Sequence, residues 1–304
     1  MDDALKPDPP HRHPLLRIIG VIIAAISRSM ARDVMLFAGG ASFFGMLALF
    51  PAIALAMSVY GLIFSASDAE QQIARFAEIM PAGAQDFVLG QMGRLADAPI
   101  AALSLNGFIA LVIALFAASR GAKAMIAGLN HLAEDRDIRN ILQFNILAMM
   151  SVLVGGALLT AANLAVLLIP VLLARLFHAL GLDALDLDSL INEWSVAAAF
   201  MFVALELLYR VTMRKRTRAV SWRASTVAAL VATALWLGLS KGFSTYVGEV
   251  IDFSVYGSLG ALVVFLLWIY WSAYAVFFGG ALAIEIDNRV RAARDDGEGT
   301  SDAG

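Results

Sequence analysis

The sequence predicts an all-α, polytopic membrane protein with six transmembrane helices, cytoplasmic N- and C-termini, and short amphipathic helices at the membrane surface. Three observations lead to this fold class. They are an apolar composition, six apolar segments long enough to cross a bilayer, and an uneven distribution of lysine and arginine between alternate loops. All three follow from the high cost of placing polar groups in hydrocarbon.

The composition is far too apolar for a protein surrounded by water. Of the 304 residues, 60% are hydrophobic and 15% are charged, and the mean hydropathy is +0.77. Soluble domains carry about 25% charged residues because their surface must be hydrated. This composition therefore indicates that lipid covers much of the protein. The net charge of -3 provides no whole-molecule attraction for a polyanion.

Six segments contain about 20 or more mostly apolar residues, the length that crosses a hydrocarbon core of roughly 30 Å. The third segment is longer than one crossing needs and contains Pro170, which removes a backbone donor. We therefore expect this segment to form one long helix that is tilted or kinked. The predicted spans are 34–64, 100–119, 141–173, 195–213, 224–247 and 257–286.

The segments that flank and connect these spans are more polar. Residues 15–32 place arginines beside an apolar stripe, which is typical of a helix lying in the membrane interface. Residues 1–33 are therefore assigned to a cytoplasmic tail with an interfacial helix, and 68–97 to two short helices on the membrane surface. The transmembrane domain then covers 34–290. The polar, glycine-rich tail 291–304 is expected to be disordered.

The distribution of basic residues predicts the orientation, because lysine and arginine in short loops concentrate on the cytoplasmic side. With both termini inside, 18 of the 22 lysines and arginines fall on the cytoplasmic side. Arg120 and Lys123 belong to this set, in the loop expected after the second span. The sequence thus predicts a multi-pass membrane protein with both ends in the cytoplasm. The four basic residues on the other side are Arg75, Arg94, Arg175 and Lys241.

Basic residues are densest between the fourth and fifth predicted spans, where residues 209–223 contain no carboxylate. We interpret this stretch as a cytoplasmic loop that sets topology and contacts anionic headgroups, at about 1 kcal/mol per cation. Nucleic-acid binding is the alternative, but it needs stacking platforms as well as phosphate contacts, and Trp222 alone is a poor platform. No nucleic acid is expected as a partner. The loop cations are Arg214, Lys215, Arg216, Arg218 and Arg223.

No residue pattern indicates an enzyme. The absence of cysteine excludes thiolate nucleophiles and cysteine-ligated metals. The chain also lacks a phosphate-binding glycine loop, a nucleophile elbow and a two-histidine zinc helix. His131 lies near Glu134, Asp135 and Asp137, which would suit a weak divalent site, but a solvated loop is the simpler interpretation. We predict no catalytic residues, no metal and no cofactor.

Ionisable side chains inside the spans raise the free energy of insertion unless they are paired or solvated, so those that are present can mark a function. Glu206 and Arg210 lie four residues apart on one helical face, so we predict an intramembrane ion pair, with a transport role as the alternative. Lys241 lies about 25 Å along the fifth span, near the outer interface. It either snorkels outward or offers a cation to a lipid phosphate or to Glu249 and Asp252.

The sixth span carries Trp268, Tyr270 and Trp271 near its middle, whereas aromatic belts normally mark the interfaces. The N–H and O–H groups of these side chains need partners at that depth. Packing between helices is one interpretation, and the lining of a groove is the other. Glycines in the same span predict close approach of neighbouring helices, at Gly257, Gly260, Gly279 and Gly280.

Residues 241–286 resemble the signature of the YihY/BrkB family of bacterial inner-membrane proteins. Supporting matches are "LFP" ending at Pro51, "MPAGAQDF", "SRGAKAMIAGLN" and "LLYRV", so the resemblance covers about residues 30–288. The closing motif departs from the pattern by two extra residues before Glu285. The signature positions are Lys241, Gly242, Phe243, Tyr246, Tyr256, Gly257, Trp268, Tyr270, Trp271, Gly280 and Glu285.

The resemblance implies six spans and says little about activity. Members of the family are linked to envelope integrity, serum resistance and virulence, and less directly to lipid handling, and some carry a ribonuclease label. We expect a protein that moves or accommodates a lipid or another amphiphile without chemistry, with membrane lipids as partners. A non-transporting scaffold and a ribonuclease are the alternatives, and the oligomeric state stays open. The expected groove residues are Lys241, Tyr246, Tyr256, Trp268, Tyr270, Trp271 and Glu285.

Overall fold

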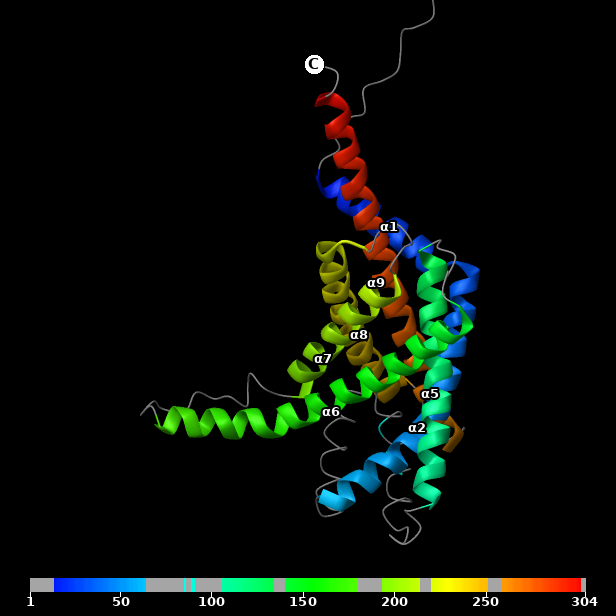
Figure 1. Ribbon diagram of the computed structural model, residues 1–304, viewed down its shortest axis with the longest axis vertical. Helices are drawn as coiled ribbons and strands as arrows, with labels where there is room; N and C mark the ends of the chain where they lie inside the picture. Colours follow the sequence, from blue (N-terminus) through cyan, green and yellow to red (C-terminus); the bar gives the residue numbers. More distant parts are fainter. Residues whose placement is uncertain are drawn as a thin grey trace, which may run out of the picture.

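Figure 1 shows the computed structural model, in which the elements of the described residues are all α-helices. The structure describes residues 14–63, 85, 89–90, 105–133, 140–179, 193–213, 220–250 and 258–301. The helices are α1 (Pro14–Ser29), α2 (Arg32–Ile63), α5 (Leu105–Leu132), α6 (Ile141–Ala179), α7 (Glu193–Thr212), α8 (Trp222–Val250) and α9 (Ser258–Ser301).

Six of these helices are long and apolar enough to cross a membrane, namely α2, α5, α6, α7, α8 and α9. The six-span prediction is therefore confirmed. Which ends of the helices face the cytoplasm stays a prediction from the distribution of lysine and arginine. The two surface helices predicted within 68–97 lie outside the described residues, apart from Gln85, Leu89 and Gly90, which are helical.

The second span differs from its predicted bounds of 100–119, because α5 covers Leu105–Leu132. Arg120 and Lys123, which were expected in the following loop, therefore lie inside a helix that qualifies as a membrane span. The physical reason is that arginine and lysine are good helix formers, so a charge does not mark the end of a helix. This correction moves two cations from the expected loop into helix α5.

The last span also continues further than predicted, since α9 ends at Ser301. Residues 291–301 are thus helical, and the expectation of a disordered tail from residue 291 is corrected for this stretch. Propagating an existing helix adds one backbone hydrogen bond for each residue that is ordered, so a polar continuation needs no nucleus of its own. Residues 302–304 lie outside the described part of the chain.

The third span forms one continuous helix, as predicted, with Pro170 inside it. α6 has 39 residues, or about 58 Å at 1.5 Å per residue, which is well above the roughly 30 Å of a bilayer core. Figure 1 shows α6 running obliquely, with its C-terminal end away from the other helices. Few of the residues in its apolar segment are buried, so α6 is the least buried of the six helices that could span a membrane.

The predicted interfacial segment forms α1, an amphipathic helix that packs against α9. Ala25 and Ser29 are buried on the packed side. The opposite side exposes a row of isoleucines, as expected for a helix whose apolar face enters the headgroup region. The exposed residues are Ile18, Ile19, Ile22, Ile23 and Ile26.

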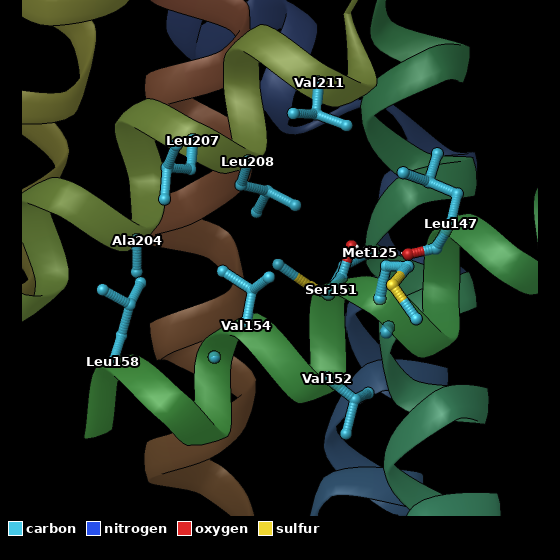
Figure 2. Close-up of a pocket in the computed structure, with 13 residues that line it drawn as sticks. Met125, Leu147, Ser151, Val152, Val154, Leu158, Ala204, Leu207, Leu208 and Val211 are labelled. Atoms are coloured by element: carbon cyan, nitrogen blue, oxygen red, sulfur yellow. Dashed lines mark hydrogen bonds between the residues drawn. The ribbon is translucent and has the colours of Figure 1, made fainter. Parts of the chain in front are cut away.

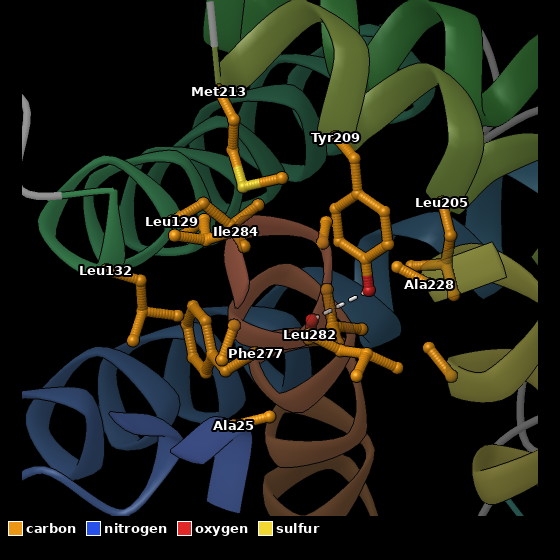
Figure 3. Close-up of a cluster of buried hydrophobic side chains, with 14 of the residues drawn as sticks. Ala25, Leu129, Leu132, Leu205, Tyr209, Met213, Ala228, Phe277, Leu282 and Ile284 are labelled. Carbon is orange, nitrogen blue, oxygen red and sulfur yellow. Dashed lines mark hydrogen bonds between the residues drawn. The ribbon is translucent and has the colours of Figure 1, made fainter. Parts of the chain in front are cut away.

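The hydrophobic core lies around α9, which contacts α1, α2, α5 and α8. Figure 3 shows Tyr209 and Leu205 of α7 near Ala228 of α8 and Leu282 of α9, while Phe277 of α9 lies beside Leu132 of α5. Alanine dominates this cluster, because small residues let helices approach closely where no water drives them together. Among the described residues, the cluster draws on every helix except α6.

Two of the predicted packing glycines lie where α9 meets other helices most closely. A Cβ atom at Gly279 would lie 2.6 Å from Cβ of Ala232 in α8 and would also clash with the Tyr209 hydroxyl of α7. A Cβ atom at Gly280 would lie 2.5 Å from Leu129 of α5. Gly260 is buried, and Gly257 lies outside the described residues. Gly128, which the sequence did not single out, plays the same role against the Phe277 ring.

Candidate functional site

Charged and polar side chains gather at one end of the bundle, which we call the charged end. It comprises the start of α2 and α8, the end of α5 and α7, and α9 from Glu285 onward. Arg28 of α1 connects three elements there, because its Nε and Nη2 atoms lie 3.1 Å from Oε1 of Glu285 and its Nη1 donates to the Leu132 carbonyl at 2.9 Å. At the same end, Nε2 of His131 lies 3.3 Å from Oδ2 of Asp33.

The predicted ion pair between Glu206 and Arg210 is present at this end. Arg210 Nε donates to Oε1 of Glu206. The same oxygen accepts from the hydroxyls of Ser225 at 2.9 Å and Thr226 at 3.3 Å, and the Arg210 guanidinium lies 3.6 Å from the Trp222 ring centroid. The pair therefore joins α7 to α8. Within the described residues, Glu206 Oε2 and Arg210 Nη2 are buried without a hydrogen-bond partner.

Asp287 is a further buried carboxylate that the sequence reasoning missed. One of its oxygens accepts the backbone N–H of Ser221 at 3.1 Å, immediately before α8, and the other pairs with Arg291. Ser221 itself caps α8 through its hydroxyl and carbonyl oxygens. A carboxylate at a helix N-terminus is stabilised by the helix dipole. The serine before an apolar helical run was the available sequence signal for the cap.

Two tryptophans join α8 and α9 through reciprocal hydrogen bonds. The indole N–H of Trp268 in α9 donates to Ser240 in α8, and that of Trp236 in α8 donates to Ser272 in α9, both at 3.1 Å. The two ring centroids lie 6.2 Å apart. Each helix therefore supplies a tryptophan and, one turn later, a serine. This geometry supports the packing interpretation of Trp268, whose polar group finds its partner in the neighbouring helix.

Replacing Trp268 with phenylalanine tests this interpretation. We expect the variant to lose about 1–2 kcal/mol of stability, because Ser240 loses a partner inside the bundle and ring contacts are reduced. Adding Ser240→Ala should recover part of the loss. Trp271→Phe is a matched control, since Trp271 is 41% exposed. Unfolding in mixed detergent micelles measures the stability of all three variants. An unchanged stability of Trp268→Phe would contradict the packing role.

The structure separates Glu285 from the other expected groove residues that it describes. Lys241 is exposed, with its ammonium 5.9 Å from the Trp194 ring, while Tyr270 and Trp271 form a separate aromatic contact on α9. Glu285 lies about 25 Å along α9 from Trp268, at 1.5 Å per residue, and it pairs with Arg28 at the charged end. Glu285 is therefore removed from the proposed groove. Tyr246 is exposed, and Tyr256 lies outside the described residues.

The basic loop is described only at its border. Arg214, Lys215, Arg216 and Arg218 lie outside the described residues. Arg223 is exposed in the first turn of α8. Contact of this loop with anionic headgroups therefore stays a prediction.

An apolar pocket that the sequence did not predict lies between α5, α6 and α7. Its volume is about 390 Å³. Figure 2 shows Val154 and Leu158 of α6 facing Ala204 and Leu207 of α7, with Met125 of α5 closing one side. The hydroxyl of Ser151 donates to the Leu147 carbonyl within its own helix, so the wall is almost entirely aliphatic. Such a pocket suits a hydrocarbon chain better than a polar solute.

Sequence comparison assigns this arrangement to a family. A family model described as Virulence factor BrkB matches residues 25–303. The chain belongs to the BrkB family. The match spans all six membrane helices and confirms the resemblance found in the last span. Together they identify a multi-pass protein of the bacterial inner membrane. No solved structure matches the chain significantly.

Several individual proteins are similar to this BrkB-family chain. A ribonuclease-like protein of Bacillus subtilis, YfkH, is 27% identical over 60% of the chain and 66% of its own length. A UPF0761 membrane protein of Rhodospirillum rubrum is 26% identical over 90% of the chain and 60% of its own length. A UPF0761 membrane protein of Xanthomonas campestris is 34% identical over 44% of the chain and 30% of its own length. The chain thus matches at most 66% of the length of these relatives.

Proposed function

We propose that this BrkB-family protein accommodates a membrane amphiphile, and moves it between environments, with the acyl chain in the pocket between α5, α6 and α7. The pocket carries this proposal. Its volume of about 390 Å³ lies within the range of about 300–1,000 Å³ for small-molecule sites, and its wall is aliphatic. A lipid tail has this chemistry, and the surrounding membrane supplies it. The role serves maintenance of the cell envelope.

The arrangement of α6 supports access to the pocket from the bilayer. α6 supplies one wall through residues from Leu147 to Leu158, yet much of this helix is exposed. A Cβ atom at Gly155 or Gly156 would meet nothing within 4 Å, so the helix is loosely packed there. A small displacement of α6 would open the pocket sideways without breaking the core around α9.

The proposed function involves no covalent chemistry. Aliphatic side chains and one hydroxyl bonded within its own helix line the pocket, and none of them transfers protons efficiently. The sequence contains no phosphate-cradling glycine loop. We propose that movement of the amphiphile draws on a gradient, on a partner protein, or on no energy source.

Filling the pocket tests the proposal. Ala204→Phe places a ring in the space between α6 and α7 and should lower photocrosslinking by a phospholipid with a diazirine in its acyl chain by about tenfold, a change of about 1.4 kcal/mol. Ala199→Phe is the matched control, because Ala199 is exposed on the same helix and does not line the pocket. Equal labelling of both variants, or labelled peptides from outside α5, α6 and α7, would refute the acyl-chain site.

Movement of lipid is tested separately from binding. In proteoliposomes, a fluorescent phospholipid should cross the bilayer faster with the protein than without it, and Ala204→Phe should return the rate towards that of protein-free vesicles. The rates for Lys241→Ala and Trp271→Ala show whether the exposed cation and the exposed indole contribute to lipid movement. A protein that binds lipid but leaves the rate unchanged would act as a lipid-binding scaffold.

A further inference from the structure

Arg120 and Lys123 lie on one face of α5, within a segment that is long and apolar enough to span a membrane. The end of α5 is located by Leu132, whose carbonyl accepts from Arg28 at the charged end. At 1.5 Å per residue, Arg120 is about 18 Å and Lys123 about 13 Å from that end. The two residues are three positions apart, so they project from the same side of the helix.

The surroundings of these cations are apolar. The Arg120 side chain is exposed, and its guanidinium lies 4.9 Å from the ring of Phe116, one turn earlier. Phe116 is 56% exposed, and Phe43 of the neighbouring α2 is 54% exposed. This face therefore meets lipid in a single copy of the chain. Arg120 extends along it, away from the charged end.

The described helices around this face supply no counterion. α5 and α6 contain no carboxylate, and the one carboxylate of α2, Asp33, pairs with His131 at the charged end. Cations within a membrane span are rare and costly unless an anion or water accompanies them. Within the described residues, α2, α5 and α6 thus provide no carboxylate for Arg120 and Lys123.

We propose that Arg120 and Lys123 bind the phosphate of an anionic membrane phospholipid on the outer face of α2 and α5. Arginine offers a planar fork of donors and lysine a compact charge, and the two at this spacing can share one phosphate. Because the Arg120 guanidinium lies over Phe116, it must turn towards Lys123 for both cations to reach the same phosphate. The site does not depend on the acyl-chain pocket, which is lined from the opposite side of α5 by Ala122 and Met125.

A second copy of the chain fits this face less well than a lipid. A twofold contact whose axis passes through this face would bring Arg120 and Lys123 close to their own copies. Like charges repel strongly where water is excluded. A phosphate neutralises both cations and is abundant at the membrane surface.

The test measures binding of phosphatidylglycerol to the full chain, by native mass spectrometry after reconstitution in phosphatidylcholine vesicles containing phosphatidylglycerol. Arg120→Gln with Lys123→Gln should weaken this binding by about 25-fold, from about fivefold per cation. The exchange Arg120→Lys with Lys123→Arg should keep most of it. Arg175→Gln, which removes an exposed cation of α6, should leave it unchanged.

The glutamine variant is expected to fold, because removing two charges lowers the cost of inserting α5 into the bilayer. A thermal melt of each variant confirms this, and the two single variants replace the double one if it is unfolded. Unchanged binding of phosphatidylglycerol by the glutamine variants would overturn the proposal. A wild-type dimer that dissociates in these variants would overturn it too, and would assign the face to contact between copies.

Discussion

Gly279→Ala is expected to destabilise the protein by about 3 kcal/mol, although it adds a single methyl group. That methyl would lie 2.6 Å from Cβ of Ala232 and would clash with the Tyr209 hydroxyl, so α8 or α9 must move. Overpacking of this kind costs about 1–3 kcal/mol. The displacement would also strain the buried hydrogen bond from Tyr209 to the Val276 carbonyl, 2.8 Å long, which Figure 3 shows as a dashed line.

A matched control separates this clash from the general effect of alanine in a helix. A Cβ atom added at Gly238 of α8 would meet nothing within 4 Å, so Gly238→Ala should be neutral or stabilising by up to about 1 kcal/mol. Tyr209→Phe in the Gly279→Ala background should recover part of the loss, because it removes one of the clashing atoms. Unfolding in mixed micelles measures each variant. Equal stability of the two alanine variants would refute the close approach of α9 to α7 and α8.

Arg28→Met is expected to cost about 2–3 kcal/mol and to release α1 from the bundle. Removal of the guanidinium leaves Glu285, whose side chain is 15% exposed, without this cation, and deprives the Leu132 carbonyl of a donor. Breaking a fully buried pair costs about 3–5 kcal/mol, and the residual exposure of both side chains reduces that figure. The released helix should show faster amide hydrogen exchange throughout Pro14–Ser29.

The double variant Arg28→Met with Glu285→Leu tests whether the loss comes from the stranded charge. It should be more stable than Arg28→Met alone, because no unpaired carboxylate remains. Arg223→Met is the control for a cation that is exposed at the same end of the bundle. If Arg28→Met left both the stability and the hydrogen exchange of α1 unchanged, Arg28 would not hold α1 to α5 and α9.

Features that depend on local chain properties were predictable. Each apolar run is longer than a bilayer core, so its length and hydropathy identify the six spans without knowledge of their neighbours. The pair Glu206 and Arg210 was predictable for the same reason, since helix geometry places residues four apart on one face. The amphipathic pattern of residues 15–32 likewise identified α1 before its contacts were known.

Features that depend on contacts between distant residues required the tertiary structure. Trp268 meets Ser240 and Arg28 meets Glu285 because different helices bring them together, and no periodicity within one helix encodes such a partner. The pocket arises from the way α6 crosses α5 and α7. Lysine and arginine are equally compatible with a loop and with a helix, so only the structure, in which α5 continues to Leu132, placed Arg120 inside a helix.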